Sequence, residues 1–120
     1  MTAPETARFG QWGERMAAVY LRDKGYEILA RNFRTVRGEL DIVAARDGTI
    51  VFVEVKSRRS ERFGRPADAV TEEKERHLRA AARIFLRQHR LYGRKIRFDV
   101  LEILDRYGQI HIRHLQGWFR

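Results

Sequence analysis

The sequence lacks cysteine altogether, and it lacks any apolar run long enough to cross a bilayer or to serve as a signal peptide. The first absence excludes disulfide bonds, thiol nucleophiles and zinc–thiolate sites. The second predicts a soluble protein of the cytoplasm. A length of 120 residues is typical of one domain, and a hydrophobic fraction of 43% predicts one continuous core.

Acidic side chains are scarce relative to basic ones. The chain has 25 Lys and Arg residues against 16 Asp and Glu residues, which gives a formal net charge of +9. A positive protein attracts polyanions, of which nucleic acid and an anionic membrane surface are the two candidates. Membrane binding needs a helix whose apolar face is free to insert, and both helices predicted below need that face for the core. We therefore expect nucleic acid as the partner.

Two stretches have the apolar spacing of amphipathic helices. The first covers residues 9–24 and ends before Gly25, and the second begins after Thr71, which is a suitable N-cap. The apolar positions are Trp12, Met16, Val19 and Tyr20 in the first helix, and Leu78, Ala81, Ala82, Phe85, Leu86 and His89 in the second. Residues 1–8 are polar and predict a flexible arm ahead of a single domain over residues 9–120.

Five further segments have the composition and alternation of β-strands. Their predicted bounds are 26–33, 39–45, 50–56, 96–104 and 110–115. The sequence Arg46-Asp47-Gly48 predicts a tight turn between the second and third strands. The resulting order, α-β-β-β-α-β-β, predicts a three-layer α+β fold with a central mixed sheet flanked by helices.

Three charged residues interrupt the most apolar pair of strands. Side chains alternate along a strand, so Glu54 and Lys56 project from one face of the third strand. Counting back from the turn places Asp41 within one residue of Glu54 on the partner strand. Adjacent carboxylates repel each other, which implies a shared proton or a cation, and oxygen ligands suit Mg²⁺ or Mn²⁺. With Lys56 placed to act on the attacking water, the three residues predict metal-assisted phosphodiester hydrolysis.

A simpler interpretation makes Glu54 and Lys56 solvated charges at a strand end, because Glu-x-Lys is a common motif. The apolar residues Val51, Phe52 and Val53 before them argue against it, since a buried strand should carry no charge. Only four of the 25 basic residues are Lys. A Lys at position 56 therefore favours a need for an ammonium group, which unlike guanidinium can lose its proton.

Two segments carry a resemblance to a known superfamily. Gly38-Glu39-Leu40-Asp41-Ile42-Val43-Ala44 and Phe52-Val53-Glu54-Val55-Lys56-Ser57-Arg58 resemble the core of the PD-(D/E)xK nucleases, without the proline before Asp41. More narrowly, they resemble the YraN-like family of bacterial proteins, relatives of archaeal Holliday junction resolvases. The likeness extends over most of the chain, through Phe9–Glu14, Ala69–Lys74 and Arg97–Val100.

The resemblance implies a restriction-endonuclease-like fold in which Asp41 and Glu54 hold Mg²⁺ or Mn²⁺ and Lys56 is the catalytic lysine. It also implies that Glu14 joins the metal site, as a first-helix Glu does in the resolvases. The alternative for Glu14 is a solvated helix position. The carbonyl of Val55 is a candidate to complete the metal shell. Because the resolvase relatives act as dimers, a homodimer is one expectation for the assembly.

Four further residues near this group have ordinary alternatives. Glu39 shares a strand face with Asp41 and is either a second acid of the site or a charge that faces water. Thr71 and Lys74, at the start of the second helix, are candidates to support the site, although an N-cap role accounts for Thr71 fully. Asp99 is expected to pair with a neighbouring Arg rather than with a metal.

Arginine supplies most of the positive charge, and it falls into two groups. One group lies in the loop after the third strand, and the other forms the outer face of the second helix, where no acid is interleaved. We predict that these side chains bind the phosphate backbone. The candidates are Arg58, Arg59, Arg62, Arg65, Arg76, Arg79 and Arg83.

The sequence thus predicts a Mg²⁺- or Mn²⁺-dependent endonuclease that acts on DNA, branched or otherwise structured. The alternative is a nuclease-like module that binds nucleic acid or a partner protein without cutting, although such a module has no use for a costly acidic pair. A third interpretation is an interaction protein whose charge serves only solubility. That interpretation predicts no salt-sensitive binding to DNA.

Overall fold

The computed structural model of the chain describes residues 5–59 and 70–119. Its elements are α1 (Glu5–Asp23), β1 (Glu27–Arg34), β2 (Glu39–Arg46), β3 (Thr49–Arg59), α2 (Glu72–Gln88), β4 (Lys95–Arg106) and β5 (Gln109–Phe119). This confirms the predicted element order and the α+β class. The strands β3 and β5 extend past their predicted ends, to Arg59 and Phe119. Within the described residues, neither helix is long and apolar enough to cross a membrane.

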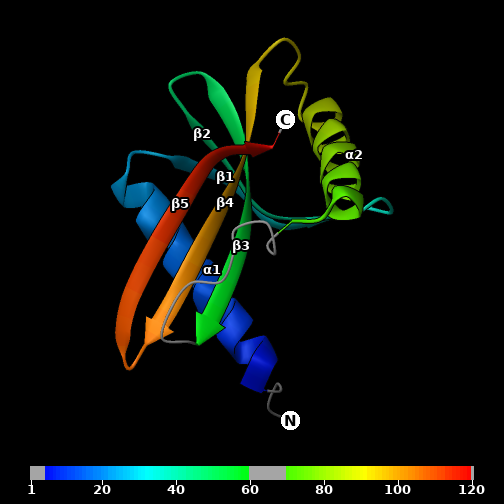
Figure 1. Cartoon of the computed structure of the whole chain (residues 1–120). Coiled ribbons are helices and arrows are strands. Elements are labelled where there is room, and N and C mark those ends of the chain that lie inside the picture. Colours follow the sequence, from blue (N-terminus) through cyan, green and yellow to red (C-terminus); the bar gives the residue numbers. More distant parts are fainter. Residues whose placement is uncertain (1–4, 60–69, 120) are drawn as a thin grey trace.

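The five strands form one mixed sheet in the order β1-β2-β3-β4-β5 (Figure 1). The central pair, β3 and β4, is parallel, and the other neighbouring pairs are antiparallel. Parallel neighbours need a crossover connection, and α2 lies in that connection. In Figure 1, α1 runs diagonally behind the sheet and α2 stands to its right. The predicted central mixed sheet flanked by helices is confirmed.

The sheet divides the hydrophobic core, which corrects the expectation of one continuous core. Under α2, the rings of Phe52 and Phe98 stack at 5.3 Å between centroids, and Phe52 meets Phe85 edge-on at 6.2 Å. Under α1, a separate cluster brings Leu21 against β-branched residues of the sheet such as Val53. A sheet that is apolar on both faces needs a helix on each, and the two helices supply them.

The helix α1 differs from its prediction in two respects. It begins at Glu5, so residues 5–8 belong to the helix rather than to an arm, and residues 1–4 lie outside the described part. Val19, predicted on the buried face, is 51% exposed, whereas Ala17 and Ala18 are buried. Small side chains let the helix backbone approach the sheet closely, and this moves the contact face away from Val19.

The β2–β3 hairpin confirms the predicted turn and fixes the register of the site. Asp47 and Gly48 both have positive φ, 50° and 77°, as a two-residue type I′ turn requires. From this turn the ladder runs without a bulge to the Ile42–Val53 pair. The turn therefore determines which residues of β3 lie beside the end of β2.

Candidate functional site

The candidate site lies where β2 and β3 separate. Their ladder ends at the Ile42–Val53 pair, while β3 stays paired with β4 along its whole length. Just beyond, the side chain of Asp41 replaces a ladder partner, because its Oδ2 accepts the backbone N–H of Val55 at 2.9 Å. This bond satisfies a strand donor that would otherwise lack a partner, and it holds the carboxylate between the diverging strands.

Glu54 is the buried acid of the site. It is only 5% exposed, and its Oε1 lies 3.3 Å from Lys74 Nζ and 3.8 Å from Lys56 Nζ. Its other oxygen, Oε2, is buried and receives no hydrogen bond from any described residue. A buried carboxylate oxygen without a partner is costly, and a bound cation would satisfy it.

The two acids perturb each other. Burial raises the pKa of Glu54 to about 7, and the negative charge of Asp41 acts in the same direction, while Lys74 and Lys56 oppose the rise. Burial also raises the pKa of Asp41, against the hydrogen bonds that it makes with Val55 and Glu54. Adjacent carboxyl groups of this kind share a proton when no cation is present.

A cavity of about 460 Å³ opens beside these acids. It is lined by Phe9, Gly10 and Glu14 from α1, by Asp41 from β2, and by Glu54, Val55, Lys56 and Ser57 from β3. Burial raises the pKa of Glu14, and the charge of Asp41 adds to this, while a hydrogen bond with Asn32 lowers it. The structure therefore brings all of the predicted metal-site and catalytic residues to one cleft.

The donor set fits a hydrated Mg²⁺ or Mn²⁺ rather than a fully enclosed ion. Across residues 5–59 and 70–119, no three His, Cys, Asp or Glu side chains converge closely enough to hold a metal by themselves. Mg²⁺ usually keeps several waters and binds through one or two carboxylates together with phosphate oxygens. Asp41 and Glu54 meet that requirement, and the unsatisfied Oε2 of Glu54 is an available ligand.

The predicted supporting residues separate into two kinds. Thr71 is confirmed as the N-cap of α2, because its Oγ1 accepts the N–H of Lys74 at 3.2 Å. This start of the helix places the ammonium of Lys74 on Glu54. Glu39 lies 3.6 Å from the guanidinium of Arg34, and its charge contributes to the raised pKa values of Asp41 and Glu14.

The arginines after β3 are placed only in part. Arg59 stacks its guanidinium over the ring of Phe9, 4.3 Å from the centroid, and Phe9 lines the cleft. Arg58, two residues beyond Lys56 along β3, is half-buried. Arg62 and Arg65 lie outside the described residues. Of this group, Arg59 is the residue that the structure places at the cleft, through its contact with Phe9.

The arginines of α2 correct one expectation. Arg79 lies 3.7 Å from Glu75, one helical turn earlier, so the outer face of the helix does contain an interleaved acid. The guanidinium of Arg79 also lies over the ring of Phe119, 5.6 Å from its centroid. Arg79 thus has structural contacts of its own, whereas Arg76 and Arg83 are exposed.

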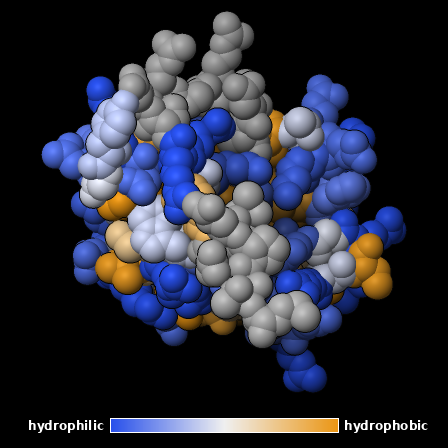
Figure 2. All heavy atoms as spheres, turned by 90° about the horizontal axis from the view of Figure 1, so that it is seen from below, coloured by the Kyte–Doolittle hydropathy of each residue, from blue (hydrophilic) through white to orange (hydrophobic). Residues whose placement is uncertain are grey.

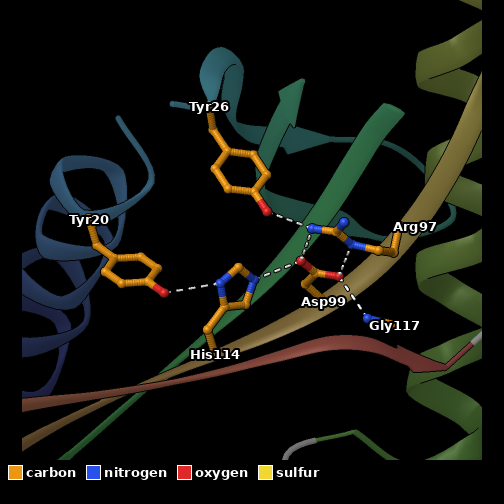
Figure 3. A network of polar contacts seen from close by, with 6 residues as sticks. All are labelled: Tyr20, Tyr26, Arg97, Asp99, His114 and Gly117. Carbon is orange, nitrogen blue, oxygen red and sulfur yellow. Dashed lines mark hydrogen bonds and ion pairs between the residues drawn. The ribbon is translucent and has the colours of Figure 1, made fainter. Parts of the chain in front are cut away.

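Asp99, on β4, is a second buried acid with a full set of partners (Figure 3). Its carboxylate accepts two hydrogen bonds from Arg97, at 2.8 and 2.9 Å, and one from the backbone N–H of Gly117 at 2.9 Å. His114 Nε2 lies 2.7 Å from its Oδ2. Burial would raise the pKa of Asp99, but the bonds from His114 and Arg97 outweigh it, and the pKa is lowered. The predicted pairing of Asp99 with an Arg is confirmed.

Two tyrosines extend this group, as Figure 3 shows. The hydroxyl of Tyr20, on α1, lies 3.2 Å from His114 Nδ1, and Arg97 donates to the hydroxyl of Tyr26 at 2.7 Å. The five side chains come from α1, from the segment after it, and from β4 and β5. The network therefore ties the helix to the far edge of the sheet. No spacing in the sequence marks His114 as part of it.

Sequence reasoning also missed Asn32, which contacts a residue of the cleft, and Ser57, which lines it. Asn32 hydrogen-bonds to Glu14 and has a φ of 53°, a conformation that Asn tolerates better than most residues. Ser57 packs against α1 so closely that a Cβ added to Gly13 would overlap its Oγ. The glycine in the first helix is a signal for such an approach, but it does not reveal the partner.

Comparison with known proteins adds a family. A family model described as "Uncharacterised protein family UPF0102" matches residues 13–103, a range that includes the acids and lysines of the cleft. A UPF0102 protein of Syntrophomonas wolfei is 52% identical over 110 residues, covering 92% of this chain and 96% of that protein. A UPF0102 protein of Caldicellulosiruptor saccharolyticus is 49% identical over 94 residues, covering 78% and 80%. One from Beutenbergia cavernae is 44% identical over 109 residues, covering 90% and 92%.

Proposed function

The chain belongs to the uncharacterised protein family UPF0102, in agreement with its resemblance to the YraN-like family, and from its cleft we propose a Mg²⁺- or Mn²⁺-dependent endonuclease acting on DNA. One observation carries the proposal. Asp41 and the buried Glu54 meet where two strands separate, and Lys56 follows two residues later on the same strand. Acids from adjacent strands and a lysine beyond them are the arrangement expected of a restriction-endonuclease-like fold.

The carboxylates of Asp41 and Glu54 would hold the metal ion. The carbonyl of Val55 and the carboxylate of Glu14 are further oxygen donors on the wall of the same cleft. When bound, such an ion polarises a phosphate oxygen and lowers the pKa of a coordinated water. The raised pKa values of Asp41 and Glu54 support this role, because acids crowded together without a cation retain protons.

Lys56 is placed to act on the attacking water and on the phosphate. Its ammonium lies 3.8 Å from Glu54, and its side chain is partly exposed, so a phosphate in the cleft can reach it. In hydrolysis, the attacking water loses a proton, a new P–O bond forms, one P–O ester bond breaks and the leaving oxygen gains a proton. An ammonium at this place holds the water and offsets the charge that develops on the phosphate.

The charge of the protein supports DNA as the substrate. The net charge of +9 favours binding to phosphates, and Arg59 at the cleft and the exposed Arg76 and Arg83 on α2 are suited to backbone contacts. Seen from the end at which α1 begins, the surface is mostly hydrophilic with small, separate apolar spots (Figure 2). Contacts between arginine side chains and phosphates position a duplex without reading its sequence.

A second candidate function is a module that binds nucleic acid without cutting it. The observation in its favour is that Lys74 and Lys56 both approach Glu54, so two ammonium groups already compensate the buried acid. A protein that never binds metal would keep such lysines for stability alone. The two functions differ in whether the protein binds a divalent cation.

A cleavage assay tests the proposal. Plasmid, single-stranded and four-way-junction DNA are incubated with Mg²⁺ or Mn²⁺ and with the wild type, Asp41→Asn, Glu54→Gln or Lys56→Ala. We expect cleavage by the wild type and a loss of at least about 10²-fold in each variant, because each removes a group that stabilises the transition state. Glu27→Gln, which changes an exposed acid at the start of β1, is the matched control. No cleavage of any substrate, together with salt-sensitive binding, would favour the non-cutting module.

A further inference from the structure

The loop between β1 and β2, residues 35–38, is a short projection that leads into the strand carrying Asp41. The N–H of Thr35 donates to the carbonyl of Gly38 at 2.9 Å, and the hydroxyl of Thr35 donates to the same carbonyl at 2.8 Å. The hydroxyl oxygen also accepts the N–H groups of Arg37 and Gly38, each at 3.0 Å. Four hydrogen bonds within four residues fix this loop before anything binds to it.

Val36 stands at the tip of the loop and is 99% exposed, the highest exposure among the large hydrophobic side chains of the described residues. A valine wholly in water contributes nothing to the core, and its β-branch leaves it few rotamers. Arg34, at the end of β1, has a side chain that is 81% exposed, and Arg37 is exposed as well. Along the chain, Val36 therefore stands between two exposed arginines, of which Arg34 lies 3.6 Å from Glu39.

The loop is fixed relative to the cleft. A Cβ added to Gly38 would lie 3.0 Å from the carbonyl oxygen of His77, so the loop packs directly against α2, the helix that carries Lys74. In the other direction, Asp41 follows Val36 by five positions along the chain, and an extended chain spans at most about 18 Å over that interval. Stacked bases are about 3.4 Å apart along one strand, so the tip lies within roughly five nucleotides of the acids.

We propose that residues 35–38 form a wedge for DNA with an interrupted stack, with Val36 entering an open base step and Arg34 and Arg37 binding the flanking phosphates. The inference rests on the proposed nuclease function and names its substrate class as branched or nicked DNA. An apolar wedge must unstack bases, and this costs least where pairing or stacking is already broken. A single valine between arginines is smaller than the apolar patches that bind proteins, which favours DNA as the partner.

The test measures binding and base stacking in metal-free buffer containing EDTA, where cleavage cannot occur. A four-way junction, a nicked duplex and a continuous duplex carry 2-aminopurine at the branch point, the nick or the equivalent base pair. The proteins are the wild type, Val36→Ser, Val36→Leu and Tyr92→Ser. Tyr92 is a matched control because it is 71% exposed and lies beyond the other end of α2.

We expect the wild type, Val36→Leu and Tyr92→Ser to raise 2-aminopurine fluorescence at the junction and the nick. Val36→Ser should lose that rise and bind these two DNAs about tenfold more weakly, with unchanged affinity for the continuous duplex. Val36 makes no core contact, so the thermal unfolding midpoint should be the same in all four proteins.

Three results would overturn the inference, and they are distinguishable. In the first, the wild type binds DNA and Val36→Ser binds it with the same affinity and fluorescence. This rejects the wedge but leaves the nuclease proposal standing. In the second, the DNA result is the same, but sedimentation shows that the wild type self-associates and that Val36→Ser does not. This assigns the tip of the loop to a protein contact instead. Failure of the wild type to bind any DNA removes the proposed function and the wedge together.

Discussion

Glu54 and Asp99 are buried acids on the adjacent strands β3 and β4, yet their surroundings differ. Asp99 receives three hydrogen bonds from Arg97 and Gly117, pairs with His114, and has a lowered pKa. Glu54 has two lysine ammonium groups at 3.3 and 3.8 Å, one oxygen that receives no hydrogen bond from the described residues, and a pKa raised to about 7.

The difference separates two uses of a buried charge. An acid whose oxygens are all satisfied stabilises the fold, and nothing remains for a ligand to bind. An acid that is buried with incomplete compensation lowers stability and keeps a position open for a cation. Of these two residues, Asp99 is thus the structural acid and Glu54 the candidate functional one. The following predictions test that division, from the largest effect to the smallest.

Asp99→Asn should lower the free energy of unfolding by about 3–5 kcal/mol, because it leaves Arg97 and its neighbours without a compensating charge. Urea denaturation at pH 7 measures the change, with Glu27→Gln as an exposed control. DNA cleavage per folded molecule should stay at the wild-type level. A loss of less than about 1 kcal/mol would contradict the structural role of the network.

Glu54→Gln should change how stability depends on pH. The folded-state pKa of about 7 lies above the ordinary value of 4.5, so the protonated form of Glu54 favours folding. That contribution is complete below about pH 4.5 and is lost as the pH rises through about 7. At about 1.4 kcal/mol per pKa unit, the wild type should lose up to about 3 kcal/mol relative to Glu54→Gln across this window. Urea denaturation in EDTA between pH 4 and 8 measures it, and parallel curves would refute the raised pKa.

Lys74→Met should tighten the binding of Mn²⁺. The ammonium of Lys74 lies 3.3 Å from Glu54 Oε1, where it repels an incoming cation. Removing one positive charge at this range should increase affinity roughly tenfold, as repulsion of about 1–2 kcal/mol implies. Isothermal titration calorimetry with Mn²⁺ compares the variant with Lys95→Met, which removes an exposed lysine at the start of β4. Equal affinities in all three proteins would show that Lys74 does not compete with the metal.

Tyr20→Phe should have the smallest effect, a loss of about 0.5–1.5 kcal/mol in the free energy of unfolding. The hydroxyl makes one hydrogen bond, at 3.2 Å to His114, and the ring stays in place. Thermal and urea unfolding measure the change. A loss above about 2 kcal/mol would mean that the hydroxyl supports the whole hydrogen-bond network around Asp99 rather than His114 alone.

The local parts of the site were predictable from the sequence. Strand alternation and the turn at Asp47 and Gly48 place Asp41 beside Glu54, because a hairpin register follows from its turn. Thr71 as an N-cap is equally local, since its partner lies three residues away. The i,i+4 pair of Arg79 with Glu75 was also available from spacing, and the sequence interpretation overlooked it.

The remaining features depend on packing between distant segments. The hydrogen bond from Val55 to Asp41 requires that β2 and β3 separate after their last pair. No residue pattern in the sequence predicts that separation. Lys74 reaches Glu54 only because α2 docks at that edge of the sheet. The face of α1 was misassigned at Val19 because periodicity gives most weight to large apolar residues, whereas two of the fully buried positions on the contact face are the small residues Ala17 and Ala18.

Gly13 links that contact face to the cleft. The missing side chain lets α1 lie against Ser57, and the next residue along the helix is Glu14, on the cleft wall. A larger residue at position 13 would push α1 outward, carry Glu14 with it and widen the mouth of the cavity. The width of the cavity mouth is therefore set by a residue that has no side chain.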